Sequence, residues 1–131
     1  MSCASNKGDT AGVASLIQKS KDNWDLSYQL RCQRMYDAAA NRLYYSLFQA
    51  VKAYAVKTGK TTIEEEVGVH GKLKGIVRDE DANHGDIFDD AMQMRVKADY
   101  LAEHVVESEL DRDFIYNAEM VRTHYESLAE R

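Results

Sequence analysis

An arginine stands inside one of the most apolar stretches of the chain, NRLYYSLFQA at residues 41–50. Seven residues on a helix return to within about 20° of the starting direction, so Arg42 and Gln49 share a face, with Tyr45 beside them. A buried guanidinium is tolerated only when it is paired and hydrogen-bonded. The pattern favours a structural salt bridge with Asp99. The alternative is a polar cleft floor that receives a phosphate or a base.

A second arginine motif, RVKADY, occupies residues 95–100. Arg95 and Asp99 are four residues apart, so they can pair along one helix face. Tyr100 follows directly and can hydrogen-bond or pack beside them. A solvated ion pair is the simplest interpretation, and a place in the same cleft as Arg42 is the alternative.

Helices must position these residues, and the composition favours an all-α fold. The sequence has no proline, the residue that most often breaks a helix interior. Apolar residues recur with helical spacing, most clearly from Leu110 to Leu128. We expect an up-and-down bundle of four main helices plus a short irregular helix. The expected helices cover about 11–33 (one helix, or two broken near 21–23), 35–58, 62–79 (the irregular one), 86–104 and 110–128.

Short motifs mark the expected ends of these helices. They are Asp9 or Thr10 as the first cap, Gly59 after the second helix, Thr61 with Glu64 or Thr62 with Glu65 as a capping box, and Ser108 with Asp111 as the last cap. A polar stretch, RDEDANHGD, is expected to form a loop that ends near Gly85.

The length and charge limit the functional classes. The chain has 131 residues, which suits one domain, expected at 11–131 after a disordered tail at 1–10. Its net charge of −5 argues against a basic surface that binds nucleic acid everywhere, although a local basic cleft stays open. No apolar run is long enough for a membrane span. Cys3 and Cys32 form no disulfide framework, so we expect free thiols and a cytoplasmic protein.

Three motifs together resemble the HEPN-domain family, in particular its small stand-alone bacterial and archaeal members. They are MYDAAANRLYYSLFQAVKAY, VHGKL and MQMRVKADYL, in the family's order, within a resemblance that runs from about residue 16 to 128. The resemblance implies a helical bundle, commonly a homodimer with its polar cleft at the interface. It also implies a small nucleotidyltransferase as partner in a toxin–antitoxin pair. Catalytic members of the family are metal-independent ribonucleases, in which an arginine is followed four to six residues later by a histidine.

This chain departs from the catalytic pattern of the family. Gln49 stands where the group commonly has histidine, and an amide cannot transfer a proton near neutral pH. No histidine follows Arg95 at the required spacing. Arg78 and His84 do have it, but the acidic residues 79–81 between them would repel an RNA phosphate. They are therefore weak catalytic candidates.

The remaining histidines and carboxylates give weaker signals. His70 is expected to be a surface or packing residue, with a cleft role only by analogy with the family. His104 and His124 are expected on regular helices and need no function. A metal site could be imagined at His84, Asp86, Asp89 and Asp90, but these residues lack a calcium-loop spacing. Acidic residues at the start of a helix are also favoured by the helix dipole, which explains them without a metal. We expect no metal and no cofactor.

Three functions stay open. The favoured one is a non-catalytic module that binds nucleotide or RNA in an arginine-lined cleft of Arg42, Tyr45, Gln49, Arg95, Asp99 and Tyr100, and that partners a nucleotidyltransferase. The second is an atypical ribonuclease that uses Arg42 or Arg95 with a tyrosine or His70. The third is a structural dimer. A homodimer is expected in any case, because helix 35–58 looks too apolar for one thin layer of helices to cover.

Overall fold

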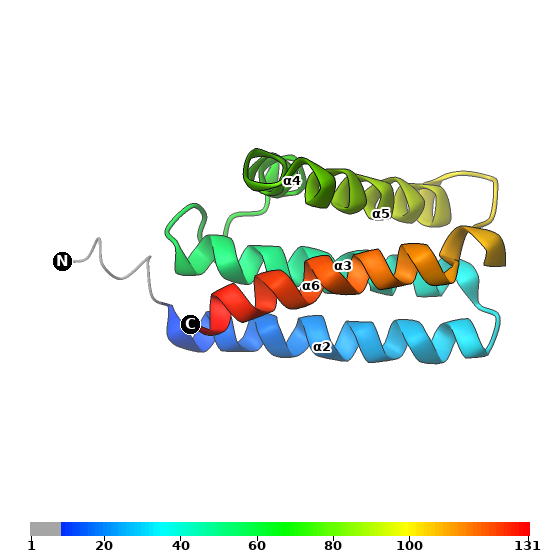
Figure 1. Cartoon of the computed structure of the whole chain (residues 1–131), viewed down its shortest axis with the longest axis horizontal. Helices are drawn as coiled ribbons and strands as arrows, with labels where there is room; N and C mark the ends of the chain where they lie inside the picture. The colour runs from blue at the N-terminus through cyan, green and yellow to red at the C-terminus, as the bar shows by residue number, and fades with distance from the viewer. Residues whose placement is uncertain (1–8) are drawn as a thin grey trace.

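The computed structural model describes residues 9–131, and these residues form helices and no strand. The expected tail therefore lies almost wholly outside the described residues. The elements are α2 (Thr10–Cys32), α3 (Tyr36–Lys57), α4 (Val69–Glu80), α5 (Ala82–Tyr100), the short 3₁₀ turn η1 (Glu107–Leu110) and α6 (Arg112–Glu130). Figure 1 shows α2, α3, α5 and α6 running side by side along the long axis, with α4 at one end of α5. The predicted all-α bundle is confirmed. No helix of the described part is long and apolar enough to cross a membrane.

Helix α3 is the central element of the bundle. Twelve of its 22 residues are buried, and it packs against α2, α4, α5 and α6 of the same chain. Small residues make this possible, because Ala39, Ala50 and Ala53 let neighbouring helices approach closely at full burial. The reason given for a homodimer, that one layer of helices could not cover this segment, is therefore wrong. Dimerisation itself stays a prediction.

Several predicted helix ends are confirmed. The Asp9 side chain accepts the Gly12 N–H at 2.9 Å, which caps α2, and α2 continues without a break through residues 21–23. Gly59 has φ 79°, the left-handed conformation that follows many helices. The cap predicted from Ser108 with Asp111 is confirmed only in part, because Asp111 itself accepts the Phe114 N–H at 2.8 Å and caps α6, while Ser108 lies in η1.

The predicted limits of the third and fourth helices are wrong. Helix α4 begins at Val69 rather than near residue 62, after a left-handed turn at Gly68, and the Thr61 and Glu65 side chains bond to each other within the preceding turns. The RDEDANHGD stretch is not a loop but is almost entirely helical. A single extended residue, Asp81, separates α4 from α5 and accepts the His84 N–H at 3.0 Å.

Position 85 at this junction requires glycine for steric reasons. A Cβ there would lie 2.8 Å from Cα of Arg78, too close for any side chain without movement of the backbone of α4. The two helices can therefore turn back on each other within one residue. The predicted end of the fourth helix near 104 is also wrong, because α5 stops at Tyr100 and an irregular stretch leads to η1, which contains Ser108.

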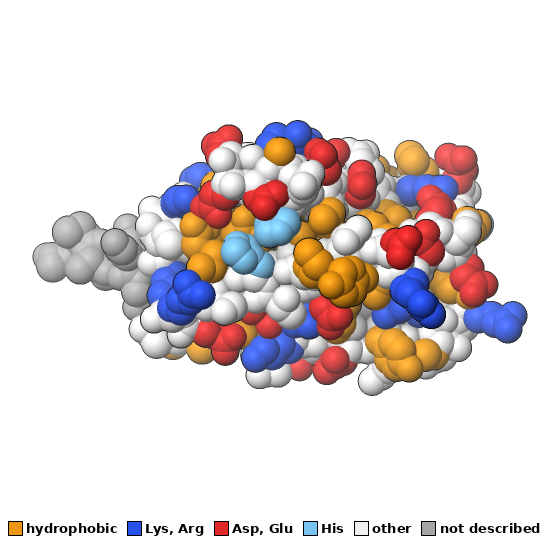
Figure 2. Space-filling model, in the orientation of Figure 1, with side chains coloured by type: hydrophobic (Ala, Val, Ile, Leu, Met, Phe, Trp, Pro, Cys, Tyr) orange, Lys and Arg blue, Asp and Glu red, His pale blue; other side chains and the backbone are white. Residues whose placement is uncertain are grey.

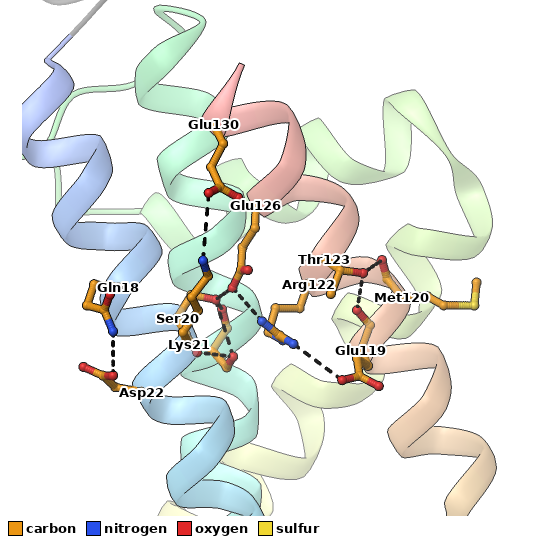
Figure 3. A network of polar contacts seen from close by, with 11 residues as sticks. Gln18, Ser20, Lys21, Asp22, Glu119, Met120, Arg122, Thr123, Glu126 and Glu130 are labelled. Carbon is orange, nitrogen blue, oxygen red and sulfur yellow. Dashed lines mark hydrogen bonds and ion pairs between the residues drawn. The ribbon is translucent and has the colours of Figure 1, made fainter.

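The bundle contains a buried charged network that the sequence patterns did not indicate (Figure 3). Arg122 Nη1 donates to Glu126 Oε2 at 2.8 Å, and both residues are buried. Ser20 Oγ donates to the same carboxylate at 2.7 Å, which ties α6 to α2. The guanidinium also lies over the Trp24 ring, 4.8 Å from its centroid. We call Arg122, Glu126 and Ser20 the core network.

Candidate functional site: an arginine groove on the central helix

Arg42 is half-buried on α3, and its hydrogen-bond partners are neutral amides. Its Nε donates to Asn41 Oδ1 at 2.7 Å, and Nη2 donates to the same oxygen. Its Nη1 donates to Asn23 Oδ1 on α2 at 3.2 Å. Among residues 9–131 no carboxylate forms an ion pair with Arg42. The predicted salt bridge to Asp99 is therefore wrong, and so is the full burial expected for this side chain.

Asp99 has other partners, which connect it to Arg42 indirectly. Its Oδ2 accepts the Asn41 Nδ2–H at 2.8 Å and lies 3.7 Å from Arg95 Nε. Asn41 thus donates to Asp99 while its own oxygen accepts from Arg42. This chain of contacts fixes the Asn41 amide so that its oxygen faces the guanidinium. Nothing in the sequence indicated that role beyond the position of Asn41 next to Arg42.

Arg95 lies among tyrosine rings on α5. Its Nη2 donates to the Tyr45 hydroxyl at 3.1 Å, and its guanidinium lies 5.7, 5.4 and 5.4 Å from the ring centroids of Tyr44, Tyr45 and Tyr100. The side chain is only 13% exposed, so the pair with Asp99 is more buried than the solvated pair that we expected. Tyr100 itself is 71% exposed.

A shallow hollow of about 420 Å³ opens beside Arg42, between the second half of α2, the first half of α3 and the end of α5. Its lining residues are Leu26, Leu30, Asp37, Ala38, Asn41, Arg42 and Asp99. We call this hollow the arginine groove. It combines one guanidinium without a carboxylate partner, two carboxylates, one amide and an apolar wall. Arg95 and Tyr45 lie next to it through their contacts with Asp99 and Arg42.

Gln49 is linked to the groove through Asn23. The side-chain amides of Asn23 and Gln49 lie 2.7 Å apart, while the Asn23 oxygen accepts from Arg42. Arg42 and Gln49, which were predicted to share a face of α3, are thus connected through a residue of the neighbouring helix. Because antiparallel α2 supplies that residue, no spacing within α3 could indicate it.

His70 packs against aromatic rings of α3 rather than lying on an open surface. The Tyr44 hydroxyl, whose pKa burial raises well above its ordinary value, lies 2.5 Å from His70 Nδ1. The ring stacks on Phe48 at 4.6 Å between centroids. Burial lowers the pKa of His70, and the charges of Arg95 and Lys52 lower it further. His70 is therefore neutral near pH 7, and its Nδ1 shares a hydrogen bond with the Tyr44 hydroxyl.

Arg78 and His84, the weak catalytic pair of the sequence, have separate partners. Arg78 Nη2 pairs with Asp86 Oδ1 at 3.1 Å. The His84 ring packs against His124, 5.1 Å away between centroids. Asp89, one of the carboxylates considered for a metal site, pairs with Lys74 at 2.9 Å.

The comparisons with known proteins identify one family. A model described as the HEPN domain matches residues 13–128, nearly the whole chain. No curated protein and no solved structure gives a match. The family match suggests a helical module that is related to nucleotides or RNA. On the extent of this match, the chain belongs to the HEPN domain family.

Proposed function

We propose that this HEPN bundle is a non-catalytic module that binds the phosphate of a nucleotide or of RNA in the arginine groove. The observation that carries the proposal is the set of partners around Arg42. Its guanidinium is held by the neutral oxygens of Asn41 and Asn23 and lies at the wall of a hollow. The amides orient the cation without cancelling its charge. A planar fork that is oriented but not neutralised is suited to bind an oxyanion in a bidentate way.

The surroundings of Arg42 supply contacts for the rest of a nucleotide. Leu26 and Leu30 give the groove an apolar wall, and the exposed Tyr100 ring next to Arg95 offers a face for a base. Stacking of a base on an aromatic ring contributes about 1–3 kcal/mol and tolerates any base. Selectivity is therefore expected to be for phosphate and a planar ring rather than for one sequence.

The amide at position 49, on the same face as Arg42, supports binding rather than acid–base catalysis. Gln49 is an amide, so in contact with Asn23 it still has no proton to transfer near neutral pH. General acid–base catalysis typically contributes about 10²–10⁴-fold in rate. Without a proton-transferring group at position 49, the groove is expected to hold RNA and cleave it little.

A second function is favoured by the position of His70. Arg95 and His70 both lie against the Tyr44 ring, with the guanidinium and imidazole 5.7 and 5.6 Å from its centroid. A neutral histidine near an arginine is the combination needed for metal-independent cleavage of a phosphodiester. Its Nδ1 is occupied by Tyr44, so only Nε2 is free for such a step.

A labelled RNA assay without metal distinguishes these two functions. We expect wild type to bind single-stranded RNA weakly, with little cleavage, and Arg42→Ala to weaken the binding. Strong cleavage by wild type that is lost in His70→Gln would replace the binding module with the ribonuclease. Cleavage that appears only in Gln49→His would support a binding site that lacks a base at position 49.

The module is also proposed to act as a homodimer and as partner of a small nucleotidyltransferase. Exposed apolar side chains support an interface, and they include Tyr28, Met35, Leu101, Val106 and Tyr116. Sedimentation at micromolar concentration is expected to give a dimer, and a monomer would contradict this part. A small nucleotidyltransferase encoded next to this chain and co-purifying with it would support the second part.

A further inference from the structure

Helix α4 lies at the outer edge of the bundle. Figure 1 shows it on the opposite side of the bundle from α2. On the face drawn in Figure 2, acidic and basic side chains gather over α4 and the start of α5, so this side of α4 faces solvent. Three of its 12 residues are buried, namely Val69, Leu73 and Val77, against twelve of 22 in α3. A helix with so few buried side chains can open locally at a lower cost than the central helix.

Two glycines weaken the first half of α4 without a packing reason. A Cβ at Gly71 or Gly75 would meet no neighbouring element or side chain within 4 Å, whereas a Cβ at Gly85 would lie 2.8 Å from Cα of Arg78. Alanine would therefore fit at positions 71 and 75. In a helix interior, glycine is disfavoured about fivefold relative to alanine, and Gly75 is such an interior position. The helix also begins after Gly68, which has no side chain to cap it.

The turn that precedes α4 is anchored to α3 at residue 63. Lys52, a buried lysine of α3, donates from Nζ to the Ile63 carbonyl oxygen at 2.9 Å. The Ile63 side chain packs on an apolar cluster of α2 and α3 that includes Val13 and Val56. The chain is therefore fixed at residue 63. Val67, four residues later, is 95% exposed, so packing does not hold that part of the turn.

The end of α4 is anchored by Glu80. Its carboxylate accepts the Tyr54 hydroxyl at 2.5 Å and the Tyr125 hydroxyl at 3.3 Å. Lys60 Nζ lies 3.1 Å from the same carboxylate. These contacts tie the last turn of α4 to both α3 and α6. The two ends of the region that contains the first half of α4 are thus fixed, one at residue 63 and the other at residue 80.

Few contacts hold the part of the chain between these anchors to the other helices. Lys72 pairs with Glu65 at 3.0 Å, but both residues belong to this part, so the pair can move with it. The contacts that reach outside it are the buried Val69 and Leu73 side chains, the Lys74–Asp89 ion pair, the Thr61–Glu65 hydrogen bond and the His70–Tyr44 hydrogen bond. Ion pairs between partly exposed side chains contribute little to stability.

We propose that residues 64–75 form a flap, which opens while the rest of the bundle stays folded. In the closed form, which the structure shows, the flap covers two aromatic side chains of α3. The His70 ring of the flap stacks on Phe48 at 4.6 Å between centroids, and its Nδ1 lies 2.5 Å from the Tyr44 hydroxyl. We call Tyr44 and Phe48 the aromatic site.

Opening of the flap changes what the aromatic site offers to solvent. His70 moves away with the flap, so the Tyr44 hydroxyl loses its hydrogen-bond partner and the Phe48 ring loses its cover. Both then become accessible beside Arg95, whose guanidinium lies 5.7 Å from the centroid of the Tyr44 ring. The flap therefore controls access to this site. The inference does not depend on the phosphate site proposed at Arg42.

Amide hydrogen exchange of the full chain without ligand, followed by NMR at increasing urea below the unfolding transition, tests this inference. The Leu73 and Lys74 N–H groups report on the flap, and the Leu47 N–H reports on α3. We expect the two flap amides to exchange about 100-fold faster than Leu47, because they open locally. Their exchange should also depend less on urea, since a local opening exposes less surface. The Asp81 N–H, bonded to the Val77 carbonyl at 2.9 Å at the anchored end, should exchange more slowly than the flap amides.

Two variants separate opening of the flap from unfolding of the whole bundle. Gly75→Ala removes the weak point of α4, so exchange at Leu73 and Lys74 is expected to slow about fivefold. Ala14→Gly weakens α2 at an exposed position by the same chemical change in reverse. It is expected to speed exchange at Leu47 about fivefold and to leave exchange at Leu73 and Lys74 unchanged.

Three outcomes would overturn the flap. Equal exchange rates and equal urea dependence at Leu73 and Leu47 in wild type would mean that α4 opens only with the whole protein. Faster exchange at Leu73 in Ala14→Gly would mean the same. Unchanged exchange at Leu73 in Gly75→Ala would mean that the opening does not involve the first half of α4. None of these outcomes affects the binding proposed at Arg42, because the experiment contains no nucleotide.

Discussion

Arg122 and Arg42 both lie on long helices against an aromatic ring, yet their partners differ in kind. Arg122 pairs with the buried Glu126 carboxylate at 2.8 Å, lies over Trp24 and is 10% exposed at its side chain (Figure 3). Arg42 lies over Tyr45, with its centroid 5.6 Å away, and its donors go to the amides of Asn41 and Asn23. One arginine is neutralised inside the bundle, and the other keeps its charge at a hollow.

The difference shows how to tell a structural arginine from a binding one. A buried ion pair satisfies its own charge, so breaking it leaves a buried carboxylate with no counter-ion. A guanidinium held by amides is oriented at little electrostatic cost and can accept an anion later. The partners of an arginine therefore indicate its role better than the apolarity of the segment around it. By this criterion we assign stability to the core network and propose binding for the arginine groove.

The largest expected effect is at the core network. Arg122→Ala leaves Glu126 buried without its counter-ion, which should lower the free energy of unfolding by about 3–5 kcal/mol. Urea denaturation followed by circular dichroism measures this. The matched control is Arg112→Ala at the exposed start of the same helix, where the change is expected to stay within about 0.5 kcal/mol. A loss at position 122 no larger than at position 112 would contradict the structural role of the pair.

A smaller decrease in the free energy of unfolding is expected when Ser20 of the core network is replaced. Ser20→Ala removes the hydroxyl that lies 2.7 Å from Glu126 Oε2, a hydrogen bond to a charged acceptor worth about 1.5–3 kcal/mol. Glu126 keeps Arg122, so the effect should be below that of Arg122→Ala. The exposed Ser127 of α6 provides the control, as Ser127→Ala. Equal denaturation midpoints of the two serine variants would argue that Ser20 does not support the carboxylate.

Arg42→Ala is expected to separate binding from stability. Its partners are amides that water can reach, so the free energy of unfolding should fall by less than about 1 kcal/mol. Nucleotide binding should weaken by about tenfold or more, because a charge-assisted contact to phosphate is lost. Thermal melts and titrations on one preparation give both quantities. A melting temperature as low as that of Arg122→Ala would show that Arg42 is structural after all.

The smallest effect concerns His70 and pH. Its pKa is lowered in the folded protein, first by burial and then by the charges of Arg95 and Lys52. The unfolded chain therefore binds more protons there, and the stability from neutral His70 is full above its unfolded pKa, about 6.5. That stability is lost as pH falls through the lower folded value. Urea denaturation at about pH 7.5 and about pH 5.5 should show a smaller decrease for His70→Gln than for wild type, whereas identical decreases would contradict the assignment.

The sequence predicted the helical class, the family and the shared face of Arg42 and Gln49, because each is local in the chain. It did not predict the partner of Arg42, because Asn23 is supplied by α2 across the helix packing. It also missed Asp81 as the single cap between α4 and α5, since a polar run can be a loop or a helix junction. The buried Arg122 looked like any surface residue of an amphipathic helix.

The partner of His104 was likewise not predictable from the local sequence. In the sequence it was the last residue of an expected helix and had no partner nearby. In the fold, Asp37 lies 67 residues earlier in the chain but 2.6 Å away, because α5 ends beside the start of α3. Chemistry that depends on the contact of two helix ends has no signature in local spacing.

The most direct test of the central claim follows both arginines in one experiment. Nitrogen-15 spectra of the arginine Nε–H groups can be recorded while uridine 5′-monophosphate is added at low salt, with the peaks assigned from Arg42→Lys and Arg122→Lys variants. We predict that the Arg42 signal moves and saturates with nucleotide, whereas the Arg122 signal stays in place. An Arg42 signal that does not move, or that moves no more than the signal of Arg122, would contradict the claim that the amide-held arginine is the phosphate-binding one.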